Sequence, residues 1–290
     1  MPLVTSEKML LAARDGRWAV GAFNAENMEM IQAIVQAAET LKAPVIIQTT
    51  PGTLKYGSLE LYLAVVSALA KNSPVPIALH LDHGETFAEA MKALRVGYTS
   101  IMIDGSHCTL GENIALTEAV VKSCAPGGIP VEGELGKVGG KEDDKSSDES
   151  GYTDPAEAAL FTEKTGVSSL AVGVGTAHGV YAKTPILNVA LIDDLKKAVK
   201  VPMVLHGASG LSDDVVRDCI SRGICKVNIA TELRIAYTEA VKSCLAGNSG
   251  SAARIIDPKK FGGPARDAVR EKVMERIKVC GCDGKAALLI

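Results

Sequence analysis

The chain alternates between short apolar segments and amphipathic segments, and this alternation repeats eight times. Short apolar runs bounded by glycine or proline predict buried strands, and apolar residues spaced three to four apart predict helices. We therefore expect strands at residues 18–23, 45–50, 76–83, 100–105, 131–136, 169–175, 202–208 and 226–230, and helices at 28–42, 59–70, 87–95, 110–125, 155–166, 189–199, 213–222 and 232–246. Each pair takes about 25 to 38 residues, the repeat of a (β/α)8 TIM barrel. A doubly wound open sheet is the alternative, but eight nearly equal units favour closure.

The length and charge of the chain agree with one barrel domain over residues 1–290 that acts on a small molecule. A barrel of this kind takes about 250 residues, and the chain has 290, of which 47% are hydrophobic. A net charge of -3 provides no overall attraction to nucleic acid or to an anionic membrane. The N-terminus lacks the pattern of a secretion signal, and seven cysteines form no disulfide framework. We expect a cytoplasmic protein without a nucleic-acid or membrane partner.

Polar residues gather where the predicted strands end. Strand interiors of a barrel normally carry Val, Ile and Leu, and the active sites of this fold lie at the carboxyl ends of the strands. The polar residues at or near these ends are Asn24, Gln48, Thr49, Thr50, Asp82, His83, Asp104, Ser106, His107, Glu132, Glu134, His178, His206, Ser209, Asn228 and Thr231. We therefore expect one active site at this end of the barrel.

Three of the five histidines stand directly before a glycine where an apolar segment ends, and these are His83, His178 and His206. Three neutral imidazoles that converge from strand ends match a catalytic zinc site, in which three protein ligands leave one position open. Three unrelated loop histidines are the alternative. Asp82 directly precedes His83, and neighbours in a regular strand point to opposite faces, so we expect the strand to turn at this point.

Two segments depart from the strand–helix rhythm. Residues 136–151 are charged, bounded by glycine and poor in apolar residues. A long loop at the active end of a barrel is often a lid, which we favour over a solvated linker. The C-terminal segment, residues 248–290, contains Pro258, Gly262, Gly263 and Pro264 before a predicted helix at 265–279. We expect this helical segment to pack against the barrel or against a neighbouring subunit.

The loops after the seventh and eighth strands predict a phosphate site. His206-Gly207-Ala208-Ser209-Gly210 follows one strand, and Asn228-Ile229-Ala230-Thr231 follows the other and leads into a helix. In barrels of this kind these two loops bind phosphate through free backbone N–H groups at helix N-termini. The glycines alone would also fit simple turns, but their position beside a predicted metal ligand favours phosphate binding.

Taken together, these motifs resemble the class II, metal-dependent ketose-1,6-bisphosphate aldolases. The matching stretches are Asp82-His83, Glu134-Leu135-Gly136, Gly139-Gly140, Gly175-Thr176-Ala177-His178-Gly179, His206-Gly207-Ala208-Ser209-Gly210 and Lys226-Val227-Asn228-Ile229-Ala230-Thr231-Glu232. The likeness runs from Ala22 to Cys280, nearly the whole chain. Thr50-Pro51-Gly52-Thr53, Gly-Thr-Ala-His-Gly and Asn-Ile-Ala-Thr-Glu are more similar to the tagatose-bisphosphate branch than to the fructose-bisphosphate branch.

The resemblance implies roles for individual residues. It implies His83, His178 and His206 as Zn2+ ligands, Asp82 as the general acid/base and Glu142, on the lid, as the group that moves the triose proton. Asp104 and Glu134 match positions of a second metal in some members, so a second divalent ion or a monovalent cation is an open alternative. The implied substrate and phosphate contacts are Asn24, Thr50, Gly179, Lys183, Gly207, Ala208, Ser209, Asn228, Ile229, Ala230 and Thr231.

The implied reaction is the reversible cleavage of a ketose 1,6-bisphosphate to dihydroxyacetone phosphate and glyceraldehyde 3-phosphate. Fructose-cleaving members are expected to have Asp where Ala230 stands, which favours tagatose 1,6-bisphosphate. Fructose 1,6-bisphosphate, the substrate of glycolysis and gluconeogenesis, remains the alternative. Thr50 stands where many relatives have Ser, and Lys183 lies one residue later than the phosphate lysine of some relatives.

Two other functions compete with this hypothesis. A metal-free aldolase would need a Schiff-base lysine, but Lys226 begins its predicted strand, which places it at the wrong end of the barrel, and Lys183 lies in a loop. A non-catalytic barrel that supports another aldolase is the second alternative. For the zinc-dependent aldolase we expect a homo-oligomer, a dimer or tetramer, in which Arg254 or Arg266 is a candidate to bind the second phosphate in a neighbouring site.

Overall fold

Eight parallel strands form a closed barrel in the computed structural model, which describes residues 3–142, 145–147, 151–181, 185, 187–246 and 256–289. The strands are β1 (Val20–Asn24), β2 (Val45–Thr49), β3 (Ile77–Gly84), β4 (Ser100–Ile103), β5 (Val131–Leu135), β8 (Ser169–Val172), β10 (Met203–Leu205) and β11 (Ile224–Ile229). Their order around the barrel is β1-β11-β10-β8-β5-β4-β3-β2, so the first and last strands pair. The predicted (β/α)8 TIM barrel is confirmed, and the open sheet is excluded.

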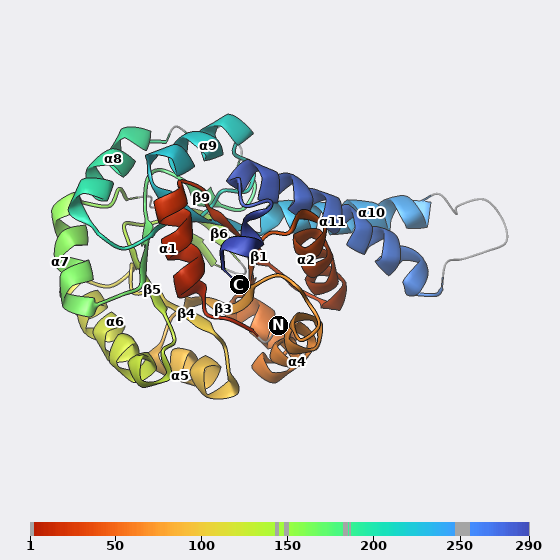
Figure 1. Cartoon of the computed structure of the whole chain (residues 1–290), viewed down its shortest axis with the longest axis horizontal. Coiled ribbons are helices and arrows are strands. Elements are labelled where there is room, and N and C mark those ends of the chain that lie inside the picture. The colour runs from red at the N-terminus through yellow and green to blue at the C-terminus, as the bar shows by residue number, and fades with distance from the viewer. Residues whose placement is uncertain are drawn as a thin grey trace.

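Helices follow the strands and surround the barrel (Figure 1). They are α2 (Met28–Leu41), α4 (Leu59–Ala70), α5 (Phe87–Val96), α6 (Leu110–Cys124), α7 (Pro155–Thr165), α8 (Val189–Ala198), α9 (Asp213–Arg222) and α10 (Thr231–Ala246), with a 3-10 turn at Ala125–Gly127. Several begin at a side chain that accepts a backbone N–H, and Thr86 and Thr109 form complete capping boxes with Glu89 and Glu112. Two further helices, α1 (Ser6–Gly16) and α3 (Pro51–Tyr56), were not predicted.

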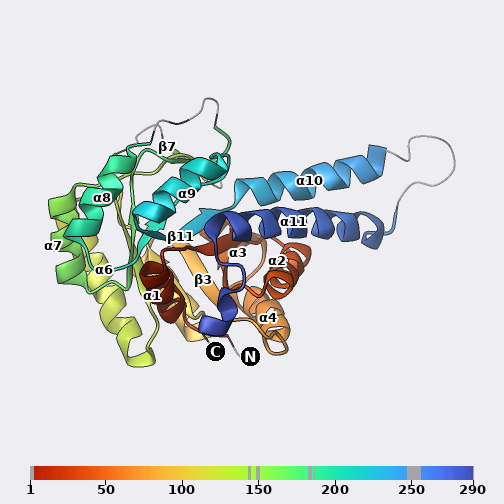
Figure 2. The same cartoon turned by 45° about the horizontal axis from the view of Figure 1, so that its top comes forward.

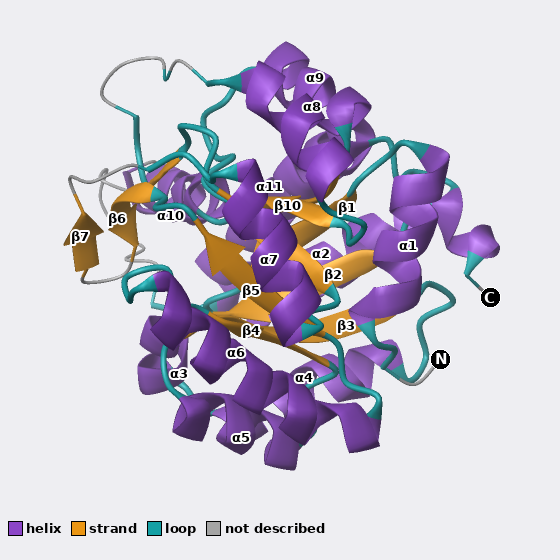
Figure 3. Ribbon diagram, turned by 90° about the vertical axis from the view of Figure 1, so that its left-hand side faces the viewer, coloured by secondary structure: helices purple, strands orange, loops and turns teal. Residues whose placement is uncertain are grey.

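Helix α1 packs against β1 and β11 at the amino-terminal end of the barrel. The two ends of the chain lie on this side of the barrel. The loops that follow the carboxyl ends of the strands lie on the opposite side (Figure 3). The predicted active-site end of the barrel is therefore the end remote from both termini.

The predicted lid contains a β-hairpin in its described part. β6 (Gly139–Glu142) pairs antiparallel with β7 (Lys145–Ser147), and Lys137 and Gly151 form a bridge at its base. β6 also pairs in parallel with the short strand β9 (Ala177–His178), which carries one of the predicted metal ligands. This small sheet stands beside the carboxyl end of the barrel (Figure 3). The hairpin is thus joined to the predicted site by backbone hydrogen bonds, and its function as a lid stays a prediction.

The C-terminal helix is longer than predicted, because α11 spans Lys259–Cys280 and includes Gly262, Gly263 and Pro264. Its buried residues recur every three to four positions (Gly262, Ala265, Val269, Val273 and Ile277) and form the stripe that packs against α2 and α10. Burial of this stripe outweighs the low helix propensity of the first two turns. The helices α10 and α11 run side by side and project from the barrel (Figures 1 and 2), and a 3-10 turn, Lys285–Leu288, follows.

A polar network fills the barrel interior below the carboxyl ends of the strands. Lys226 is 0% exposed and lies inside the barrel, because β11 begins two residues earlier than predicted, at Ile224. The prediction that Lys226 is at the wrong end of its strand is therefore wrong. His80 joins this network: its Nδ1 lies 2.7 Å from the Ser100 hydroxyl and its Nε2 lies 3.3 Å from the Lys226 ammonium. None of the described helices is long and apolar enough to cross a membrane.

The buried histidine of this network makes stability depend on pH. Burial, followed by the charge of Lys226, lowers the pKa of His80 from 6.5 to about 3. As the pH falls below 6.5, the unfolded chain takes up a proton at His80 and the folded chain does not, so the free energy of unfolding decreases. Between pH 7 and pH 5.5 we expect the free energy of unfolding to fall by about 1 kcal/mol less in His80→Gln than in the wild type. Urea unfolding of the metal-free proteins measures this difference.

Glutamine is chosen because its amide can still hydrogen-bond to Ser100. His107 is exposed, so His107→Gln is the matched control for loss of a surface histidine. Equal loss of stability in the wild type and in His80→Gln would contradict the assignment of this pH dependence to His80.

Candidate metal centre and the loop pocket

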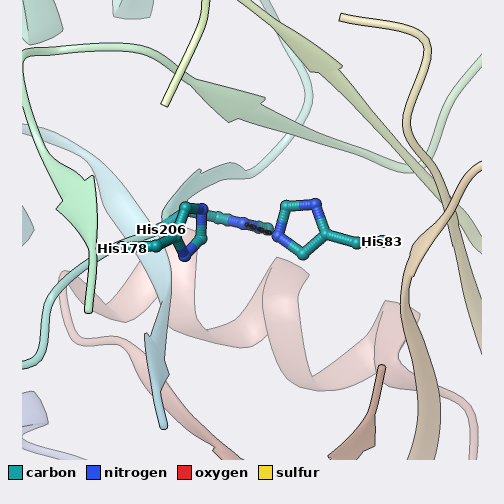
Figure 4. Close-up of side chains that lie close together, drawn as sticks. All are labelled: His83, His178 and His206. Atoms are coloured by element: carbon teal, nitrogen blue, oxygen red, sulfur yellow. Dashed lines mark hydrogen bonds between the residues drawn. The ribbon is translucent and has the colours of Figure 1, made fainter. Parts of the chain in front are cut away.

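The three predicted metal ligands lie together at the carboxyl end of the barrel. His83 lies on β3, and His206 follows β10 directly. His178 lies on β9, beyond the end of β8, so it comes from the small sheet and not from a barrel strand as predicted. Each of the three offers a nitrogen, and these nitrogens lie within 4.8 Å of one another. The rings are nearly perpendicular, with centroids 4.7 to 5.9 Å apart, and converge on one point (Figure 4).

A turn in β3 brings His83 into this cluster. His83 has φ of +51°, a left-handed conformation that is uncommon for residues other than glycine. The pairing of β3 with β4 also shifts register between Leu81 and Gly84. In a regular strand Asp82 and His83 would point to opposite faces. The predicted turn is present, and it lets both side chains reach the same site.

Two carboxylates determine which nitrogens face the centre. Asp104 Oδ2 lies 2.9 Å from His83 Nδ1, and Glu132 Oε1 lies 3.0 Å from His206 Nε2. Burial raises the pKa of each carboxyl, but the hydrogen bond from His83 to Asp104 and the charge of Lys226 beside Glu132 outweigh burial and lower both. Ionised carboxylates only accept hydrogen bonds, so the histidine nitrogen that faces each of them carries the proton.

With the protons of both rings on the carboxylate sides, the remaining nitrogens, His83 Nε2 and His206 Nδ1, are the ones available to a metal, and they lie 2.9 Å apart. Asn228 Nδ2 also lies 3.1 Å from His206 Nε2, but we place the proton on Nε2 because Glu132, at 3.0 Å, can only accept. Burial lowers the pKa of His178 and His206, so these rings are neutral at pH 7. In tetrahedral zinc with bonds of 2.0–2.1 Å, neighbouring nitrogens are about 3.3 Å apart, so this donor set fits Zn2+.

Asp82 lies beside the histidine cluster and is 1% exposed. Its Oδ2 accepts from Asn24 Nδ2 at 2.8 Å and from Gln48 Nε2 at 3.2 Å, and its Oδ1 accepts from Asn228 Nδ2 at 3.2 Å. Burial alone would raise the pKa of Asp82, but its electrostatic interactions with His83, His206 and Lys226 outweigh burial and lower the pKa. Three amide donors stabilise the same charged form. Asp82 is thus a rigidly held carboxylate.

A second group that could hold a metal adjoins the first. One ligand atom each of His83, Asp104 and Glu134 also lie within 4.8 Å of one another. Glu134 Oε2 lies 3.8 Å from His206 Nδ1, so the carboxylate faces the histidine cluster. Because His83 belongs to both groups, occupancy of one site would affect the other. Asp104 and Glu134 thus lie beside the histidine cluster, and their role as ligands of a second metal stays a prediction.

A small pocket opens beside the histidines, and we call it the loop pocket. It is lined by Asn24, His178, Gly179, Gly207, Ser209, Asn228, Ala230, Thr231 and Arg234. The Ala230 N–H donates to Ser209 Oγ at 3.1 Å, which joins the loops after β10 and β11. Helix α10 begins at Thr231, so its N-terminus faces the pocket. This arrangement suits an anionic group.

Tyr181 fixes the two loops that carry His178 and His206. Its hydroxyl accepts from the Ala177 N–H at 2.8 Å and donates to the Gly207 carbonyl at 2.7 Å. Gly207 has φ of +65°, and a Cβ there would lie 2.6 Å from the Ala177 carbonyl oxygen. Only glycine allows these two backbones to approach so closely.

Some predicted contacts lie outside the pocket. Thr50 caps α3, with its hydroxyl 3.2 Å from the Thr53 N–H. Ala208 and Ile229 are buried in the apolar core, so their side chains face away from the pocket. Glu142 is the last residue of β6, but its side chain lies outside the described part of the structure, as do Lys183 and Arg254.

The sequence analysis placed Gln48 and Glu132 among the polar residues at the strand ends but gave them no role, and it did not assign Lys226 or Arg234 to the site. The missed signal is strand alternation, because residues two apart on a strand face the same side. Glu132 precedes Glu134 by two residues, and Lys226 precedes Asn228 by two. Both members of each pair face the barrel interior. The sequence analysis gave a role to the member at the strand end and none to its partner one layer deeper.

Comparison with known proteins agrees with this geometry. Residues 4–285 match the family model "Fructose-bisphosphate aldolase class-II". The YdjI aldolase of Escherichia coli K12 is 37% identical, with a TM-score of 0.86, and the match covers 98% of this chain and 99% of that chain. A candidate fructose-1,6-bisphosphate aldolase from Coccidioides immitis is 29% identical, with a TM-score of 0.88 and 97% of both chains covered.

A third structure shares the fold. The fructose-bisphosphate aldolase of Campylobacter jejuni is 24% identical, with a TM-score of 0.83, and the match covers 98% of this chain and 97% of that chain. The family model spans nearly the whole chain and includes every residue of the histidine cluster. The chain therefore belongs to the class II fructose-bisphosphate aldolase family, a family of lyases.

Proposed function

We propose that this protein is a zinc-dependent aldolase that cleaves a ketose 1,6-bisphosphate to dihydroxyacetone phosphate and glyceraldehyde 3-phosphate. The observation that carries the proposal is the cluster of His83, His178 and His206, whose ligand atoms lie within 4.8 Å of one another, beside the buried carboxylate of Asp82. Members of class II use zinc, and the three histidines fit that ion. The reaction is accordingly the one that the family resemblance implies.

His83, His178 and His206 would hold the ion, and Asp104 and Glu134, with His83, would hold a second divalent ion where one binds. When bound, zinc supplies a Lewis acid that polarises the ketose carbonyl and stabilises the negative charge that develops on its oxygen. The carboxylates of Asp104 and Glu132 keep the ligating nitrogens free of protons. A lysine Schiff base is then not required.

Asp82 moves the proton of the substrate hydroxyl. In the cleavage direction the carboxylate takes the proton of the C4 hydroxyl as the C3–C4 bond breaks, and in condensation it returns that proton. Asn24, Gln48 and Asn228 hold the carboxylate by their amides, so it needs little reorganisation during the reaction. Glu142, on the β6–β7 hairpin, is proposed to exchange the proton of the triose product.

The loop pocket is proposed to bind a phosphate of the substrate. Gly179, Gly207 and Ser209 provide small residues on one side, and Asn228, Ala230 and Thr231 lie on the other. Small residues allow backbone N–H groups to approach a phosphate closely. The Ser209–Ala230 hydrogen bond keeps the two sides at a fixed separation.

Tagatose 1,6-bisphosphate is the favoured substrate. Ala230 lines the loop pocket where fructose-cleaving relatives are expected to have Asp, and a methyl group cannot accept a hydrogen bond from a sugar hydroxyl. Fructose 1,6-bisphosphate is the alternative, since it differs only at one stereocentre.

The proposal extends to a cytoplasmic, single-domain homo-oligomer. Arg266, which donates to Gln32 at 3.4 Å, is a candidate cross-subunit contact.

The two competing functions fit the site less well. Lys226 lies inside the barrel, but its ammonium is 2.8 Å from Glu132 and lies below His206, where it is committed to an ion pair. A non-catalytic barrel would have no use for Asp82, a buried carboxylate held by three amide groups. Burying such a charge costs free energy and is typical of an active site.

The first test removes the proposed acid/base. We expect Asp82→Ala to retain zinc but to lose about 10²- to 10⁴-fold in kcat, because proton transfer by a positioned group contributes that much. Cleavage kinetics and metal analysis of the purified variant measure both quantities. Asp283 is exposed, and Asp283→Ala is the matched control. Unchanged cleavage by Asp82→Ala would remove Asp82 from the mechanism.

The second test addresses metal and substrate together. We expect a chelator to abolish cleavage and added Zn2+ to restore it, with no borohydride-trapped adduct on Lys226. Before chelation, kcat/KM should be higher for tagatose 1,6-bisphosphate than for fructose 1,6-bisphosphate. Activity that survives the chelator and is lost on borohydride treatment would establish the Schiff-base alternative instead. A preference for fructose would reject only the substrate assignment.

A further inference from the structure

A buried ion pair lies one layer below the histidine cluster. Lys226 Nζ is 2.8 Å from Glu132 Oε2, and the two side chains are 1% and 2% exposed. The other carboxylate oxygen, Oε1, lies 3.0 Å from His206 Nε2. Glu132 therefore uses one oxygen for a permanent cation and the other for a metal ligand. The reaction proposed above has no step for Lys226.

The barrel fold does not by itself explain why a Lys–Glu pair is buried at this position. Replacing a buried ion pair by apolar residues of similar volume is often neutral or stabilising, whereas removing only one partner is strongly destabilising. A barrel interior is normally filled with Val, Ile and Leu. A Lys–Glu pair at this depth therefore needs a reason other than packing, and the contact of Glu132 with His206 provides one.

We propose that Lys226 is a positioning residue for the metal ligand His206 and acts through Glu132. This inference rests on the proposed zinc site. The ammonium balances the charge of Glu132 and holds the carboxylate in the orientation in which Oε1 accepts the His206 Nε2 proton. That hydrogen bond fixes the tautomer and the ring orientation of His206, so that Nδ1 faces the metal.

A hydrogen-bonded chain holds Lys226 from the other side. His80 Nε2 lies 3.3 Å from the ammonium, His80 Nδ1 lies 2.7 Å from Ser100 Oγ, and Ser100 Oγ lies 2.8 Å from Ser6 Oγ. Ser6 is the first residue of α1, which packs at the amino-terminal end of the barrel. The ammonium is thus fixed between Glu132 and a chain anchored at the far end of the barrel.

A comparison with Asp104, the carboxylate that orients His83, shows why Glu132 needs a neighbouring cation. Asp104, which orients His83, is 17% exposed and accepts a backbone N–H from Ser106 at 3.0 Å. Its charge is stabilised by water and by the backbone. Glu132 is 2% exposed, and its two oxygens contact His206 and Lys226. A carboxylate at this depth requires a neighbouring cation to remain charged.

The test compares Lys226→Met with the double variant Lys226→Met/Glu132→Leu. The zinc affinity of each metal-free protein is measured by competition with a chromophoric chelator, and the Tm of the same protein is measured in parallel. Tyr98→Phe is the matched control, because it removes a buried hydrogen bond, to Thr49 at 2.9 Å, without contact with the histidines.

We expect Lys226→Met to lower both the Tm and the zinc affinity, the latter by about 10- to 100-fold, the usual effect of removing support from a metal ligand. The double variant should recover the Tm, because it has no unpaired buried charge, but the zinc affinity should stay low. Tyr98→Phe should lower the Tm and leave the zinc affinity unchanged.

Recovery of both Tm and zinc affinity in the double variant would overturn the inference, because the pair would then be merely structural. Unchanged zinc affinity in Lys226→Met would also overturn it. A wild-type protein that binds zinc but cleaves no ketose bisphosphate would reject the proposed reaction and leave the positioning role intact. Failure of the wild type to bind zinc would reject both.

Discussion

The hydrogen bonds of His83 to Asp104 and of His206 to Glu132 are the interactions on which the site depends. His83 and His206 come from strands far apart in sequence, and closure of the barrel places their nitrogens 2.9 Å apart. Without Asp104 and Glu132, either ring could carry its proton on the nitrogen that faces the other ring and donate a hydrogen bond to it. With both carboxylates ionised, that proton is held on the far side of each ring. The two facing nitrogens are therefore the ones available to a metal ion.

The site extends below the ligands in layers. Asp82, Glu134 and Asn228 face the carboxyl end of the barrel, and two residues earlier on the same strands lie His80, Glu132 and Lys226. This spacing follows from the two-residue period of a strand. The upper layer lies beside the histidine cluster, and Glu132 of the lower layer contacts both Lys226 and the ring of His206. Polar residues replace the usual aliphatic layers in both, so their hydrogen bonds, and not packing alone, determine the geometry.

Sequence reasoning predicted the barrel and the three histidines because both depend on local patterns. Apolar runs that end in His-Gly are visible without coordinates, and they indicated His83, His178 and His206. The position of Lys226 depended on where β11 begins, and a boundary shift of two residues moved it from the barrel end to its interior. The origin of His178 was also hidden, because β9 exists only through pairing with β6, a contact between distant segments.

The C-terminal helix illustrates the same limit and also explains why the chain continues past the barrel. Its glycines and Pro264 suggested a break, and only the packing of its buried stripe against α2 accounts for a helix there. From this helix Arg276 Nε reaches Glu232 at 2.6 Å and Arg276 Nη1 reaches Asp213 at 2.9 Å. Glu232 in turn accepts the Gly210 N–H at 2.7 Å. One guanidinium thus ties the first turns of α9 and α10 together beside the loop pocket. The side chains of Arg276 and Glu232 are 11% and 12% exposed, so the ion pair between them is shielded from competing water, whereas Asp213 is 41% exposed. The extension is therefore part of the structure that holds the loop pocket, although no residue of α11 lines it in the described part of the chain.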